Sequence, residues 1–130
     1  MTDRRNGQQA GKFTREQDLN KRNTGKRYES LAADYLQGQG LTIMERNYQD
    51  RTGEIDLIGR DGTFLVFVEV KYRGDMRSGD PAEAVTPRKQ QHIRRTAQYY
   101  LYSHRCGDVP CRFDVVSILG EEIRWIRDAF

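Results

Sequence analysis

Long apolar runs are missing from this sequence: no stretch approaches the roughly 20 consecutive apolar residues that a membrane-spanning helix needs, and none near the start resembles the apolar segment of a signal peptide. Cysteine is scarce as well. Cys106 and Cys111 have a spacing that fits neither a redox motif nor a usual zinc pair, and adding His104 still leaves a zinc site one ligand short. We therefore expect a cytoplasmic protein with two reduced thiols and no membrane partner.

The net charge is only +3, but it is unevenly distributed along the chain. Residues 1–27 contain eight Lys and Arg against three Asp and Glu, and residues 86–105 contain five Lys and Arg and no acidic residue. The stretch between them is acidic. A polyanion held by basic segments around an acidic, cation-binding centre would fit this distribution. Basic tails and solvated helix faces are also common in proteins that bind no nucleic acid.

The chain divides into two parts by composition. Residues 1–23 form a basic tail with almost no apolar side chains, which predicts disorder. Residues 24–130 form a single domain. The domain begins with a predicted helix over residues 25–37, with Thr24 as its N-cap and Gly38 after its last turn.

Five predicted strands and a second helix follow. Apolar and β-branched segments bounded by turn residues predict strands over residues 42–47, 54–59, 63–72, 112–119 and 122–127. A helix from Pro87 to about Ser103, with Thr86 as its N-cap, separates the third strand from the fourth. The order is αβββαββ, which predicts an α/β fold with a mixed sheet flanked by helices.

The second and third predicted strands are joined by Asp61-Gly62, a dipeptide typical of two-residue hairpin turns. With these two residues at the centre of the turn, Asp56 lies opposite Phe67 and on the same face as Glu69. The two carboxylates become diagonal neighbours about 7–8 Å apart. Like charges this close destabilise a sheet unless a cation offsets them, and Mg²⁺ prefers carboxylate oxygens. A turn one residue longer would move Glu69 to the opposite face.

Lys71 follows Glu69 on the same face and would add positive charge beside such a cation. Their strand, residues 63–72, is apolar on both faces before it reaches Glu69, which is typical of a central strand that ends at a functional site. Glu29, at the edge of the apolar stripe of the first helix, can reach the same end of the sheet. The alternative is that Glu69 and Lys71 form an exposed ion pair of little energetic value, and that Glu29 is simply solvated.

The second helix carries the basic residues best placed to contact phosphates, because several of them lie away from its apolar stripe. Gln90 falls on the inward face, where it either caps the first turn or faces the site; the first interpretation is favoured. The predicted nucleic-acid contacts are Arg73, Arg88, Lys89, Gln90, Arg94 and Arg95.

Together these residues resemble the PD-(D/E)xK nuclease superfamily, which includes archaeal Holliday-junction resolvases, and more closely the YraN family of bacterial nuclease-like proteins. The resemblance covers about Gly25 to Phe130. It is carried by Gly25-x-x-x-Glu29-x-x-Ala32, Gly53-Glu-Ile-Asp-Leu-Ile58, Phe67-Val-Glu-Val-Lys71-x-Arg73, Gly79-Asp-Pro81 with Lys89, Arg112-Phe-Asp-Val115 and Ala129-Phe130. The sequence departs from the usual pattern at Tyr28, where a small residue is expected, and at Ile55, where proline is usual.

The resemblance implies a restriction-endonuclease-like αβββαββ core and a Mg²⁺- or Mn²⁺-dependent endonuclease acting on branched, repair or recombination DNA. It implies that Asp56, Glu69 and the main-chain carbonyl of Val70 hold the metal. Lys71 would orient water or stabilise the transition state. Glu29 would act on the metal through water or help to place a second ion. Resolvases of this superfamily are usually dimers, so a homodimer is one of the partnerships considered.

Two other hypotheses remain open. A nucleic-acid-binding module could keep the same fold without cutting, and it would need no metal. RNA is not separated from DNA by any residue, although no aromatic platform typical of RNA recognition is visible. Glu54, opposite Glu69 in the predicted register, is a weaker metal-ligand candidate, and Asp114 is expected to be structural.

Overall fold

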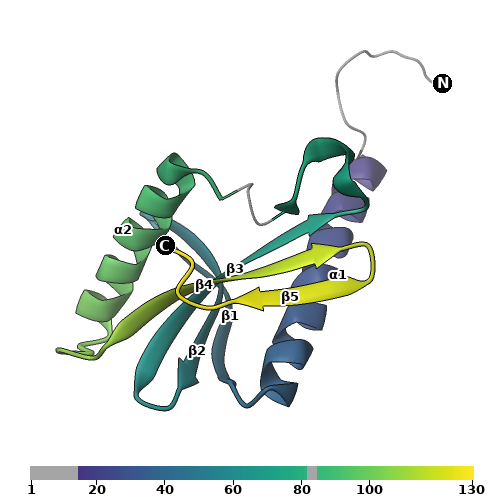
Figure 1. The fold of residues 1–130 in the computed structure, drawn as a ribbon. Helices are drawn as coiled ribbons and strands as arrows, with labels where there is room; N and C mark the ends of the chain where they lie inside the picture. Colours follow the sequence, from purple (N-terminus) through teal and green to yellow (C-terminus); the bar gives the residue numbers. More distant parts are fainter. Residues whose placement is uncertain (1–14, 82–84) are drawn as a thin grey trace.

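Two helices enclose a single sheet in the computed structural model, which describes residues 15–81 and 85–130 (Figure 1). The helices are α1 (Arg15–Gly38) and α2 (Pro87–Ser103). The strands are β1 (Thr42–Asp50), β2 (Gly53–Asp61), β3 (Phe64–Arg73), β4 (Cys111–Leu119) and β5 (Glu122–Ile126), and a short 3₁₀ helix, η1 (Met76–Ser78), follows β3. The predicted order of helices and strands is confirmed.

The five strands lie in the order β1-β2-β3-β4-β5. Only β3 and β4 are parallel, because α2 carries the chain across the sheet between them. The other neighbours are antiparallel. This is the mixed α/β sheet that the sequence predicts, and it is consistent with a restriction-endonuclease-like core. Neither α1 nor α2 has an apolar segment long enough to cross a bilayer.

The core consists of two apolar clusters, one on each face of the sheet. Ala32, Ala33 and Leu36 of α1 pack on one face, against residues that include Val66 and Val68 of β3. On the other face, α2 covers a cluster built from Ile55, Ile58, Leu65, Phe67, Val85, Ile93, Ala97, Tyr100 and Val115. Strand β3 is therefore covered on both sides, as its continuous apolar sequence predicts.

The first helix begins earlier than expected. It starts at Arg15, so Thr24 lies inside α1 and is not its N-cap. Leu19 is the one apolar side chain in residues 15–23, and an argument from an apolar stripe does not detect helical turns of such composition. Residues 1–14 of the predicted tail lie outside the described residues, and the division of the chain at residue 24 stays a prediction.

The start of α2 agrees with its sequence signals. Thr86 has an extended conformation, its hydroxyl accepts a hydrogen bond from the Lys89 amide at 3.2 Å, and Pro87 occupies the first helical position. The cap fixes where the first turn of α2 lies, and this turn carries Lys89 to the end of β3.

The predicted hairpin register is wrong by two residues. Asp61 pairs with Phe64, and Phe67 faces Ile58 instead of Asp56. Gly62, with φ of 61°, becomes the first central residue of the turn, a position that favours glycine in type II′ turns. A shift of two residues keeps the paired side chains from Leu57 to Asp61 on their predicted faces, whereas a shift of one would have reversed them. Ile55, which precedes this ladder in β2, lies on the opposite face from the predicted one, in the cluster that contains Phe67.

Asp114 on β4 is fully buried and joins several parts of the fold. Its carboxylate accepts hydrogen bonds from Arg112 Nε at 2.9 Å, from Trp125 Nε1 at 2.8 Å and from the main-chain amide of Asp128 at 2.9 Å. Arg112 also donates from Nη2 to Asp61 Oδ2 at 2.9 Å, at the β2–β3 turn. The network agrees with the structural role expected from the sequence.

We expect Asp114→Ala to lower the free energy of unfolding by about 3–5 kcal/mol, because it leaves Arg112 with Asp61 as its one carboxylate partner among the described residues and removes the acceptor of the Trp125 indole and the Asp128 amide. Urea denaturation followed by circular dichroism measures this change. The matched control is Asp75→Ala, which removes an exposed ion pair with Arg77 and should cost about 1 kcal/mol or less. Equal, small losses in the two variants would show that the Asp114 network does not stabilise the fold.

Candidate active site

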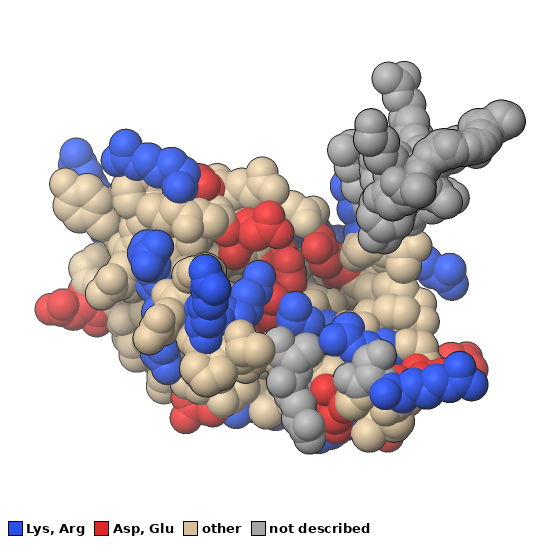
Figure 2. Space-filling model, turned by 90° about the horizontal axis from the view of Figure 1, so that it is seen from above, with Lys and Arg blue, Asp and Glu red and all other residues tan. Residues whose placement is uncertain are grey.

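A pocket of about 470 Å³ opens at the end of the sheet, between the two helices. Figure 2 looks down on this end and shows acidic side chains gathered in a hollow, with Lys and Arg side chains beside them. The charged residues that line the pocket come from four elements: Glu29 of α1, Glu54 and Asp56 of β2, Glu69, Lys71 and Arg73 of β3, and Lys89 of α2.

The pocket exists because β2 and β3 stop pairing before either strand ends. Their ladder finishes at Leu57 and Val68, although both strands continue. Residues on both sides of Asp56 break the alternation of a regular strand, since Ile55 and Leu57 lie in the two opposite apolar clusters. Beyond the break, Asp56 Oδ2 accepts the main-chain N–H of Val70 at 2.8 Å. A side-chain carboxylate thus replaces the missing main-chain acceptor.

Glu69 is held between two lysines. Its Oε2 lies 3.4 Å from Lys71 Nζ on the same strand and 3.5 Å from Lys89 Nζ on α2. Glu69 is only 5% exposed, whereas both lysine side chains are partly exposed at the pocket. The two ammonium groups offset the cost of burying the negative charge of Glu69.

Asp56 and Glu29 have a different environment. Burial, together with the negative charge of Glu69, raises the pKa of Asp56 to about 8. Burial and the nearby charge of Glu54 also raise the pKa of Glu29. One carboxylate oxygen of Glu29, Oε1, is buried without a hydrogen-bond partner. In residues 15–81 and 85–130, the ion pairs formed by these pocket lysines go to Glu69 and none goes to Asp56.

This donor set fits a divalent cation. Among the described residues, no three Asp, Glu, His or Cys side chains form a ready metal cluster by themselves. Mg²⁺ usually takes one or two carboxylates and completes its shell with water and phosphate. The carboxylates of Asp56 and Glu69 with the Val70 carbonyl meet that requirement, and a cation there would offset the charge that burial disfavours.

The four predicted catalytic residues, Glu29, Asp56, Glu69 and Lys71, all line this one pocket. Glu54 lines it too, at an exposed position. The geometry that brings Asp56 to Glu69 is not the diagonal pair expected from the sequence. It depends on the divergence of β2 from β3, which a strand pattern does not predict.

The predicted nucleic-acid contacts do not lie in one place. Arg73 and Lys89 line the acidic pocket, and Arg88 is exposed on α2. Gln90 Nε2 donates to the Val85 carbonyl at 3.1 Å, the capping arrangement favoured from the sequence. The remaining two, Arg94 and Arg95, border a second pocket between α2 and the sheet.

Sequence reasoning missed two features of the site. Lys89 was assigned to phosphate contact alone, and its ion pair with Glu69 joins residues 20 positions apart, which no local pattern indicates. Tyr28 and Tyr72 also line the pocket, with their rings stacked at a centroid distance of 3.7 Å. Tyr28 lies one residue before Glu29, and the aromatic ring at this unusual position is the only sequence signal for that contact.

Residues 28–118 match the model of a family described as "Uncharacterised protein family UPF0102". The chain belongs to the UPF0102 family. This is the family to which the resemblance to YraN proteins points.

Relatives with the same family name come from diverse bacteria. A UPF0102 protein of Lachnoclostridium phytofermentans is 51% identical over 86% of this chain and 96% of the relative. One from Nitrosomonas europaea is 50% identical over 83% of this chain and 93% of the relative. A UPF0102 protein of Klebsiella pneumoniae is 47% identical over 82% of this chain and 85% of the relative. These names state membership of a family and no activity.

We expect Asp56→Asn to stabilise the protein in EDTA at pH 8, by roughly 1–3 kcal/mol. The pKa of Asp56 is raised in the folded state, so the folded protein binds the proton more tightly than the unfolded chain. Stability contributed by this group is therefore lost as the pH rises from about 4 toward 8. Near pH 4 wild type and variant should be equally stable.

Urea denaturation at a series of pH values measures this difference. Asp34→Asn, at an exposed position of α1, is the matched control and should change little at any pH. An Asp56→Asn protein that is less stable than wild type at pH 8 would contradict the burial argument.

Proposed function

We propose that this protein is a metal-dependent nuclease that hydrolyses phosphodiester bonds, acting in the cytoplasm on branched, repair or recombination DNA. The observation that carries the proposal is the convergence of Glu29, Asp56 and Glu69, from three different elements, on one pocket that also holds Lys71 and Lys89. Burying acidic side chains together is unfavourable for folding. Such an arrangement is typical of sites that bind a cation and a phosphate.

Asp56, Glu69 and the Val70 carbonyl would hold Mg²⁺ or Mn²⁺, with Glu29 close enough to Asp56 to act through water. A divalent ion supplies charge neutralisation at a phosphate and makes a water molecule more acidic. The Val70 amide fixes the Asp56 carboxylate in place, so this ligand is oriented before any cation binds. Preorganisation of this kind lowers the cost of reaching the transition state.

The two lysines have separate tasks in the proposal. Lys71, on the same strand as Glu69, orients the attacking water or stabilises the charge that develops on the phosphate. Lys89 approaches from α2 and is more exposed, so it is the better placed to hold the incoming phosphate. Lys71 and Lys89 would both be available to hold a substrate phosphate if Glu69 were a metal ligand.

The test is cleavage of labelled single strands, duplexes, flaps and four-way junctions with Mg²⁺, Mn²⁺ or EDTA. We expect metal-dependent cutting by wild type and at least about a 100-fold loss in Glu69→Gln and Lys71→Met. Glu121→Gln, in the exposed turn after β4, is the matched control and should cut normally. Equal cutting by wild type and Glu69→Gln, or no cutting of any substrate, would refute the proposed site.

Lys89 gives a second test of the same site. We expect Lys89→Met to lower the single-turnover rate at saturating DNA by about 10- to 100-fold, since it removes a charge from the reacting phosphate, and Lys89→Arg to restore part of it. The neighbouring Arg88→Met should weaken DNA binding and leave that rate unchanged, because Arg88 is exposed and makes no ion pair with Glu69 among the described contacts. Equal effects of the two Met variants on the rate would remove Lys89 from the site.

One observation favours the alternative, a binding module that does not cut. Glu69 already has two lysine partners, so an ion triad could hold this end of the sheet without a metal. Titration calorimetry with Mn²⁺ separates the two functions. A nuclease site binds the ion and loses it in Asp56→Asn, whereas a binding module shows no heat that depends on Asp56. A homodimer would suit a junction with two equivalent strands, and it stays a proposal.

A further inference from the structure

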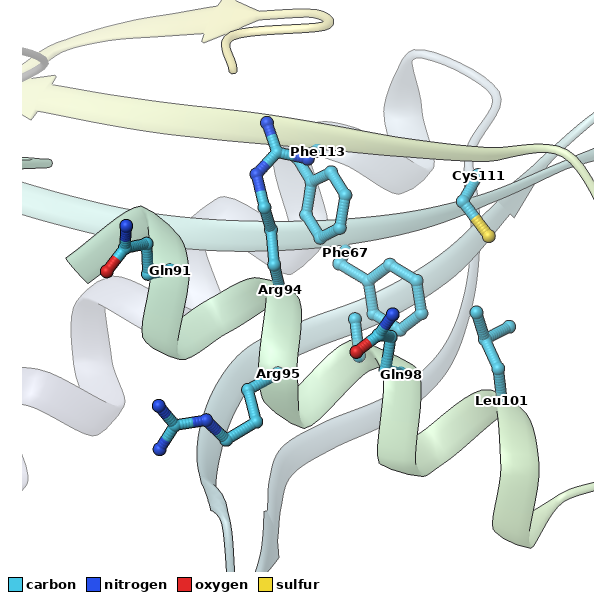
Figure 3. A pocket seen from close by; sticks show the side chains of 9 residues that line it. Phe67, Gln91, Arg94, Arg95, Gln98, Leu101, Cys111 and Phe113 are labelled. Atoms are coloured by element: carbon cyan, nitrogen blue, oxygen red, sulfur yellow. The ribbon is translucent and has the colours of Figure 1, made fainter. Parts of the chain in front are cut away.

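A second hollow, of about 510 Å³, lies between α2 and the sheet. Its floor is formed by Phe67 and Phe113, whose rings stack with centroids 5.5 Å apart. Figure 3 shows Arg94 and Gln98 extending from α2 toward these rings, while Leu101 and Cys111 close the other end. The hollow therefore has an apolar end and a polar, basic end.

This hollow and the acidic pocket border the same two elements. Phe67 lies two residues before Glu69 on β3, a distance of about 7 Å along the strand. On α2, Lys89 lies in the acidic pocket and Gln98 in the hollow, about 14 Å further along the helix axis. A nucleic-acid strand with one phosphate at Glu69 would reach the hollow within one or a few nucleotides.

The side chains of the hollow suit a nucleotide. Arg94 lies over Phe113 at 4.9 Å and over Phe130 at 5.4 Å, and it forms no ion pair with an acidic side chain of the described residues. Ring contacts hold the guanidinium and leave its N–H groups for a phosphate oxygen. The amide of Gln98 offers both a donor and an acceptor, as the edge of a base requires. The acid-free sequence of residues 86–105 adds a positive field along α2.

The volume agrees with this assignment, since sites for small organic groups commonly measure about 300–1,000 Å³. Phe67 is only 1% exposed, so the apolar surface that a base would cover comes from the half-buried side chains of Phe113, Leu101 and Cys111, and such surface accepts a base whatever its identity. Two exposed Gln side chains, Gln91 and Gln98, stand at the rim and can adjust to different base edges.

We infer that this hollow receives the base of an unpaired nucleotide, close along the strand to the phosphate at Glu69. The inference rests on the proposed function and narrows its substrate class. A base inside an intact duplex must leave its stack to enter, at a cost of a few kcal/mol, whereas a frayed, branched or single-stranded site presents it freely. The protein should therefore select DNA with unpaired bases next to the cut.

The test compares binding of two labelled strands of equal length in EDTA, a 12-nucleotide oligothymidylate and its fully abasic sugar-phosphate counterpart. Fluorescence anisotropy with the full chain gives both affinities. We expect wild type to bind the base-containing strand about tenfold more tightly, because each stacked base contributes about 1–3 kcal/mol. Gln98→Trp fills the hollow from an exposed position and should reduce this ratio to about one, with the affinity for the abasic strand unchanged.

Tyr102→Trp is the matched control, because it places the same ring on an 82% exposed position of the same helix outside the hollow. It should keep the tenfold ratio. Tight binding of both strands with equal affinity by wild type would overturn the base site and leave the proposed nuclease standing. Binding of neither strand would remove the nucleic-acid premise and the base site together. A ratio that survives in Gln98→Trp would place the base elsewhere.

Discussion

The hydrogen bond from the Val70 amide to the Asp56 carboxylate is the contact on which this end of the molecule depends. Main-chain pairing between β2 and β3 has already ended at Leu57 and Val68. Without a substitute acceptor, the Val70 amide would lose its partner at the edge of the core. With Asp56 in that position, the two strands can separate, and the gap between them becomes the acidic pocket. The hydrogen bond between Val70 and Asp56 therefore explains both why the pocket opens and where the Asp56 carboxylate lies.

Two aspartates show how this chain uses buried charge in opposite ways. Asp114 accepts hydrogen bonds from a guanidinium, an indole and a main-chain amide, so its charge is fully satisfied within the protein. Asp56 accepts one main-chain amide and lies close to Glu69, and its pKa is raised accordingly. A buried charge with a full set of partners stabilises a fold, whereas one with few partners is disfavoured. In the proposed function, Asp56 is therefore the carboxylate that a cation would complete, and Asp114 is not.

The sequence predicted what depends on periodicity and local signals. Strand β3 was evident because its apolar residues are continuous, and α2 because Thr86-Pro87 marks its start. The hairpin register was wrong, yet Asp56, Glu69 and Lys71 still line one pocket, because a shift of two residues preserves the faces of the paired residues from Leu57 to Asp61. The end of the β2–β3 ladder and the contact of Lys89 with Glu69 could not be predicted, because both depend on how distant elements pack. The sequence analysis did not predict the turns of α1 before Thr24, because these turns carry no apolar stripe.

Helix α2 connects the acidic pocket, the second hollow and the core, and its distance from the sheet is set by a close contact. Gly53, at the start of β2, approaches Thr96 of α2 so closely that a Cβ there would lie 2.8 Å from Thr96 Oγ1. Thr96 is buried and its hydroxyl donates to the His92 carbonyl, so it has little freedom to retreat. Any larger residue at position 53 would push α2 outward. Because Lys89 and Gln98 belong to this one helix, such a displacement would move the lysine that pairs with Glu69 and the rim of the hollow together.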